Sequence, residues 1–172
     1  MIYFNSKYLS DNLGINNAKW KRWSREFLQP DPLGGYQSGY ARQFSYKDAF
    51  QVFFAGYMVS ELKFSVSETR QMLKVINPWL RKQGFFGLPT QKSRAIQQNN
   101  HIYIAKLPSG KFAYAVRAVD ENQVDGKMAS GEQRYSLIAI DGQGDFLQQD
   151  VILHARVIMI NSLYRYFIGK LQ

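Results

Sequence analysis

The chain has 172 residues, of which 45% are apolar and 20% are charged, and its net charge is +9. This composition is that of a folded globular protein. No apolar run approaches the roughly 18 residues needed to cross a bilayer, and the polar start does not resemble a signal peptide, so we expect a cytoplasmic protein without a membrane partner. Because the chain has no cysteine, disulfides, thiol catalysis and cysteine-ligated zinc are excluded.

The positive charge is concentrated in the first half of the sequence. Residues 1–94 contain 14 Lys/Arg and 6 Asp/Glu, a balance of +8, whereas residues 95–172 contain 8 and 7, a balance of +1. Such a distribution indicates a polyanionic partner for the first half, although a basic surface kept for solubility would have the same charge.

Two short helices are predicted near the start. In "NSKYLSDNLGIN" Ser6 is a candidate N-cap, and Gly14 suits a left-handed helix exit. The next helix follows after a turn of about three residues, with Asn16 or Asn17 as its cap. Two helices joined by a short glycine-containing turn are typical of helix-turn-helix.

The second helix, about Asn17–Phe27, contains "AKWKRWSREF" and has two different faces. At 100° per residue its aromatic side chains fall within about 60° of one another, and its basic side chains cluster opposite with the small Ala18. The aromatic set is Trp20, Trp23 and Phe27, and the basic set is Lys21, Arg22 and Arg25. We expect the first set to be buried and the second to face outward.

Residues 29–40, "QPDPLGGYQSGY", predict a loop or wing, and Tyr36, Tyr40 and Phe44 at its end could form a short β-ribbon. Ser45 is the expected cap of a third helix with a broad aromatic face. Ser67 is the expected cap of a fourth helix, which Pro78 should end or kink. The Gly-rich and basic residues after it predict a linker.

From about residue 100 the periodicity is that of strands. "HIYIAKL", "KFAYAVRAV" and "RYSLIAI" predict an antiparallel meander, and "VILHARVIMI" predicts a further strand because half of its residues are β-branched. Asn161 or Ser162 should cap a final helix with one apolar face. The expected fold class is therefore α+β.

The order of helix, turn, basic helix, wing, helix and helix resembles the winged helix-turn-helix of the mercury-resistance regulator (MerR) family over roughly residues 3–76. "LGIN" is similar to that family's first turn, "KRW" to the core of its recognition helix, "FLQP" to the lead into its wing, and "GYARQFSYKD" and "LKFSVSETRQML" to the starts of its last two helices. The resemblance implies that residues 1–83 form the DNA-binding domain. The Gly-rich segment predicts a linker at 84–99, and the change to strand periodicity predicts a β-rich dimerisation or effector domain at 100–172.

The resemblance also implies a sequence-specific transcriptional regulator. Its recognition helix would lie in the major groove of double-stranded DNA, with the wing arginine on phosphate. The candidate DNA-binding residues are Asn17, Lys19, Lys21, Arg22, Arg25, Tyr40 and Arg42. Independently of the resemblance, an α-helix fits the major groove of DNA, and Arg or Lys can bind guanine there.

Other functions remain open at this stage. The helix-turn-helix could be a structural unit of a protein-interaction or small-molecule-binding module, and residues 100–172 could bind an effector, a partner protein or a second copy. A homodimer is expected because one recognition helix contacts few base pairs. We expect neither an enzyme nor a cofactor or metal: His101 and His154 stand without a catalytic pattern, and "DGQGD", residues 141–145, is expected to be a tight turn.

Overall fold

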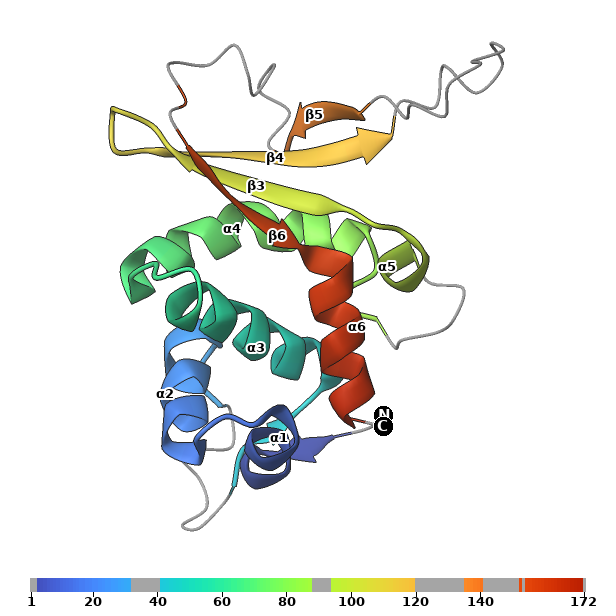
Figure 1. Cartoon of the computed structure of the whole chain (residues 1–172). Coiled ribbons are helices and arrows are strands. Elements are labelled where there is room, and N and C mark those ends of the chain that lie inside the picture. Colours follow the sequence, from blue (N-terminus) through green and yellow to red (C-terminus); the bar gives the residue numbers. More distant parts are fainter. Residues whose placement is uncertain are drawn as a thin grey trace. The chain divides into compact units, whose positions relative to one another are not determined.

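The structure is a computed structural model that describes residues 3–31, 41–87, 94–119, 135–140, 152 and 154–171. These residues form helices and antiparallel sheets, so the expected α+β class is confirmed (Figure 1). The chain divides into two compact units, residues 1–97 with 163–172 and residues 98–162. The expected division differed, since it assigned residues 163–172 to the C-terminal domain.

The first unit is mainly helical. Its elements are β1 (Phe4–Asn5), α1 (Ser6–Leu13), α2 (Asn17–Phe27), β2 (Gln43–Phe44), α3 (Tyr46–Ser60), α4 (Val66–Lys82), α5 (Arg94–Gln97) and, from residue 163, α6 (Ile160–Leu171). Strands β1 and β2 pair antiparallel, with Phe4 opposite Phe44. This pairing joins the segment before α1 to the segment that leads into α3.

Polar side chains determine where the first two helices begin. Asn5, not Ser6, caps α1, because its side chain accepts the Tyr8 backbone N–H at 2.8 Å. Gly14 ends α1 with a φ of 66°, as expected for a left-handed exit. Asn16 caps α2 and accepts the backbone N–H groups of two of its first residues.

Capping boxes start the next two helices. Ser45 caps α3 as expected, and its hydroxyl and the Asp48 carboxylate each bind the other residue's backbone N–H. The expected cap of α4 was wrong by two residues. Ser65 accepts the Glu68 N–H, and the Glu68 carboxylate accepts the Ser65 N–H at 2.9 Å, which starts the helix before Ser67.

Pro78 lies inside α4 and does not end it. The helix continues to Lys82, and the backbone N–H of Phe85 then donates to the Leu80 carbonyl at 3.1 Å. Phe85 is 1% exposed and stacks on Phe50 with ring centroids 6.0 Å apart. The aromatic core therefore holds the chain on both sides of the proline, and the second residue of the expected linker at 84–99 is a core residue.

Aromatic side chains dominate the core of the first unit. The ring of Phe50 on α3 lies 4.8 Å from that of Tyr164 and 5.3 Å from that of Phe167, both on α6. The expected apolar face of α6 is confirmed, since Tyr164, Phe167, Ile168 and Leu171 are all buried. The helix begins at Ile160, one residue before the earlier of its two expected caps.

The second unit is a four-stranded antiparallel sheet. Its strands are β3 (His101–Lys106), β4 (Phe112–Val119), β5 (Tyr135–Ala139) and β6 (Ala155–Met159), in the order β5-β4-β3-β6. The expected meander of β3, β4 and β5 is confirmed, and β6 pairs with β3. One face carries a buried cluster of Ala105, Ala113 and Ala115.

Candidate nucleic-acid interface

The buried face of α2 fixes the helix on the first unit. Trp20, Trp23 and Phe27 are buried, as expected, and the ring of Trp20 meets that of Phe44 edge-on at 5.7 Å. Gly56 on α3 lies so close to the indole of Trp23 that a Cβ atom there would overlap the ring. Large aromatic contacts on two sides therefore set the rotation of α2.

The opposite face of α2 is exposed and basic. Ala18, Lys19, Lys21, Arg22 and Arg25 are all exposed, which confirms the expected separation of the two faces. Within the described residues, Lys21, Arg22 and Arg25 make no hydrogen bond or ion pair with their side chains. Their positive charges are therefore not neutralised by the protein and are available to an anionic partner.

The acidic residue of α2 is neutralised instead. Glu26 forms an ion pair with Arg70 of α4, and the Nε of Arg70 also donates to the Glu26 carbonyl at 3.0 Å. This contact ties the last turn of α2 to α4. It also removes the one negative charge that would otherwise oppose the cations of α2.

Three of the predicted residues surround one cavity. Lys21 and Arg25 of α2 and Arg42, which precedes β2, line a hollow of about 700 Å³. Its other described lining residues are Ser6, Ser24, Leu28, Gln29, Pro30, Asp31, Ala41 and Phe44. The guanidinium of Arg42 donates to the Gln29 carbonyl at 2.9 Å and lies 5.7 Å from the ring centroid of Phe44. Arg42 is thus held beside the basic face of α2.

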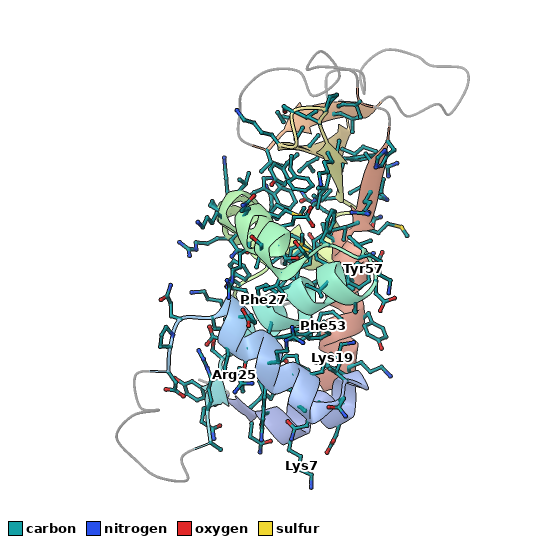
Figure 2. The ribbon with its side chains drawn as sticks, turned by 90° about the vertical axis from the view of Figure 1, so that its left-hand side faces the viewer. Lys7, Lys19, Arg25, Phe27, Phe53 and Tyr57 are labelled. Carbon is teal, nitrogen blue, oxygen red and sulfur yellow. The ribbon has the colours of Figure 1, made fainter. Side chains whose placement is uncertain are left out.

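Lys19 lies apart from this group. Figure 2 shows Lys19 and Arg25 on opposite flanks of α2, and Lys7 projecting from α1. The Nζ of Lys19 lies 5.0 Å from the centroid of the Trp23 ring. Lys19 also lines a second cavity of about 510 Å³, together with Phe53 and Tyr57 of α3. The cation is therefore held against an aromatic surface on the other flank.

The structure gives the remaining two predicted residues different positions. Asn17, the first residue of α2, is half-buried, and its side-chain oxygen is enclosed without a hydrogen-bond partner among the described atoms. Tyr40 lies outside the described residues, as do the rest of the expected wing and the "DGQGD" segment. Arg70 was not predicted from the sequence. Glu26, an acidic residue on an otherwise basic helix, was the signal that a cation elsewhere in the chain would pair with it.

The two histidines do not form a site in the described part of the chain. His101 lies on β3 opposite Arg117 of β4; burial and this neighbouring cation lower the pKa of His101, against a hydrogen bond to Asn99. His154 is exposed. Across the described ranges, no three His, Asp or Glu side chains are grouped as metal ligands would be.

Comparisons of the chain with protein-family models, with curated proteins and with solved structures found no match. Among the helices that the structure describes, none has the length and apolar character needed to cross a membrane.

Proposed function

We propose that the chain is a sequence-specific DNA-binding transcriptional regulator of the winged helix-turn-helix type, with α2 as its recognition helix. The observation that carries the proposal is the exposed basic face of α2, on which Lys21, Arg22 and Arg25 have no partner among the described residues. A helix anchored by buried aromatics can present such a face at a fixed angle. The balance of +8 in residues 1–94 supports a polyanionic partner.

The dimensions and chemistry of α2 suit the major groove. An α-helix fits this groove, where Arg and Lys donate to guanine O6 and N7, and where further cations bind phosphate. In helix-turn-helix proteins the first residues of the recognition helix contact base edges. Asn17 occupies that position in α2.

The other candidates would bind the DNA backbone. Arg42 is held beside Lys21 and Arg25 and would contact a phosphate, in agreement with the wing arginine of the family that the sequence resembles. Lys19, on the other flank of α2, would contact a second phosphate, and Tyr40 would act with the wing. The roles of Lys19 and Arg42 predict salt-dependent binding, because each phosphate contact releases a counterion and makes the dependence of log K on log salt concentration steeper by about one.

The test begins with selection of a binding site from random duplex DNA by the full chain. Titrations of the selected duplex at two salt concentrations then compare Arg22→Ala and Lys21→Ala with the wild type. We expect a loss of about 1–3 kcal/mol in binding where the side chain contacts a base, and a smaller salt slope where it contacts phosphate. Lys82→Ala removes an exposed cation from α4 and is the matched control.

Two results would contradict the proposal. Selection could yield no sequence that the chain binds more tightly than random duplex, or the α2 variants could bind the selected site as tightly as Lys82→Ala does. Melting curves of all variants separate a loss of binding from a loss of folding, because exposed cations contribute little to stability.

The cavity beside α2 favours a second candidate function, the binding of a small anionic ligand. Its lining combines the cations Lys21, Arg25 and Arg42 with apolar Leu28 and Phe44, which suits a molecule that has a carboxylate or phosphate and an apolar part. Arg42→Ala should then abolish the stabilisation of the protein by such ligands. If DNA binding fails and this stabilisation is found, the second candidate replaces the first.

A further inference from the structure

The cavity beside Lys19 is a feature of the first unit that the proposed function does not use. Its volume of about 510 Å³ is within the range of small-molecule sites. Its lining comes from the turn between α1 and α2 and from α2, α3 and α6, and all of these residues belong to the first unit. Segments far apart in the sequence therefore meet around one hollow.

Aromatic rings from three helices line this cavity. They are Trp23 of α2, Phe53 and Tyr57 of α3, and Tyr166 of α6, and Figure 2 shows Phe53 and Tyr57 on the flank of Lys19. Tyr166 is 50% exposed and stacks on Phe53, with ring centroids 6.2 Å apart. Because aromatic rings stack on one another, such a wall suits a planar apolar group.

The ring of Trp23 is held in place before any ligand binds. Gly56 of α3 lies against its six-membered ring, and the Nζ of Lys19 lies 5.0 Å from its centroid. A wall that is already ordered loses little conformational freedom when a ligand binds, which favours affinity.

Two opposite charges line the same cavity. Lys19 and Glu61 are both exposed, and within the described residues neither side chain forms an ion pair. The ammonium of Lys19 can bind a carboxylate, and the carboxylate of Glu61 can bind an ammonium group, in each case through a charge-assisted hydrogen bond. The charges of the cavity are therefore complementary to those of a zwitterion.

We propose that this cavity binds a small zwitterion that carries an aromatic ring, of which an aromatic amino acid is the simplest example. The ring of the ligand would lie among Trp23, Phe53 and Tyr166. Its carboxylate would accept from Lys19, and its ammonium would donate to Glu61. A ring without charges would leave both side chains unpaired, and a zwitterion without a ring would leave the aromatic wall in water.

Lys19 links this site to the proposed function, because the same ammonium is a candidate for contact with a DNA phosphate. A ligand carboxylate at Lys19 would neutralise its charge. The bound ligand should therefore weaken DNA binding and make its salt dependence shallower by about one. This effect on DNA rests on the proposed function, whereas binding of the ligand to the free protein does not.

Isothermal titration calorimetry of the full chain without DNA tests the site. The probes are tryptophan, alanine, tryptamine and indole-3-propionate. Alanine lacks the ring, tryptamine lacks the carboxylate, and indole-3-propionate lacks the ammonium group. We expect tryptophan to bind about tenfold or more tightly than each of the others, because each lacks one of the three contacts.

Variants of the lining residues assign each contact. Lys19→Ala and Glu61→Gln should each weaken tryptophan binding about tenfold or more, and Tyr166→Ala about twofold to tenfold. Lys19→Ala should also lose the preference for tryptophan over tryptamine, and Glu61→Gln the preference over indole-3-propionate. A merely structural role would not change these preferences. Arg25→Ala removes a cation from the other flank of α2 and is the matched control, with unchanged affinity.

The proposal is overturned if tryptophan does not bind the wild type, if alanine binds as tightly, or if Lys19→Ala and Glu61→Gln keep the wild-type affinity. All four altered residues are exposed, and melting curves without ligand check that the variants fold. A failure of DNA binding leaves the calorimetric result unaffected. If the chain binds both DNA and tryptophan, a DNA affinity that tryptophan does not change would exclude Lys19 as the link between the two.

Discussion

Replacement of Gly56 by alanine tests how α2 is held against α3. Gly56 lies inside α3, where glycine is a poor helix former, so that alanine would by itself stabilise the helix by about 1 kcal/mol. The structure predicts the opposite sign. A Cβ at this position would overlap three atoms of the indole of Trp23, which is 5% exposed and cannot move away without displacing α2.

The expected magnitude follows from these two opposing terms. Insertion of a methyl group into a packed core costs about 1–3 kcal/mol, and a rigid ring that meets it with three atoms should place Gly56→Ala near the upper end. Subtraction of the helix-propensity gain leaves a net destabilisation of about 2 kcal/mol. For a chain of this length that loss lowers the melting temperature by about 4–8 °C.

The assay is thermal and urea unfolding followed by circular dichroism, for the wild type, Gly56→Ala, Trp23→Leu and the double variant. Leucine removes the six-membered ring that the Cβ would overlap, so Gly56→Ala should be neutral or stabilising in the Trp23→Leu background. The reasoning is refuted if Gly56→Ala stabilises the otherwise unchanged protein, or if it destabilises both backgrounds equally.

Three further predictions concern individual side chains. Ser65→Ala should cost about 1 kcal/mol of stability in urea unfolding and Ser67→Ala almost nothing, because Ser65 caps α4; equal losses would contradict this assignment. Tyr164 is buried without a hydrogen-bond partner for its hydroxyl among the described atoms, and burial raises its pKa to about 12 from 10. Ionisation of Tyr164 does not change the stability of the protein below about pH 10 and lowers it as the pH rises from about 10 to about 12. Tyr164→Phe should therefore reduce the loss of melting temperature at alkaline pH, and an unchanged pH profile would exclude Tyr164 as the source of that loss. Trp20→Ala should destabilise the protein by about 3–5 kcal/mol through the cavity that it leaves, whereas Arg22→Ala should melt like the wild type; the opposite order would exclude Trp20 as the anchor of α2.

The faces of α2 could be predicted from sequence because one periodicity determines them. Trp20, Trp23 and Phe27 recur at the spacing of a helical face, and the cations fall between them, so the burial of one set and the exposure of the other need no tertiary information. Gly14 could also be predicted, because the left-handed backbone conformation at the end of α1 favours glycine. The two faces of the candidate site and the end of α1 thus both follow from local sequence.

Features that depend on distant contacts could not be predicted. Pro78 has a local tendency to end a helix, but the packing of Phe85 on Phe50 continues the element. The position of Arg42 beside α2 likewise depends on its bond to the Gln29 carbonyl, which no short sequence pattern indicates. The cap of α4 is different, because Ser65 and Glu68 have the local spacing of a capping box, a sequence signal that the expected cap at Ser67 overlooked.

The place of α6 in the first unit affects the order in which the protein can fold during synthesis. The Tyr8 hydroxyl donates to the carbonyl of Leu171, which is 163 positions later in the chain. The ring of Tyr164 on α6 also packs against that of Phe50 on α3. The ribosome therefore releases the strands of the second unit before the helix that completes the aromatic core. Until residues 163–171 emerge, α3 has no α6 to pack against, and this part of its apolar surface is open to aggregation.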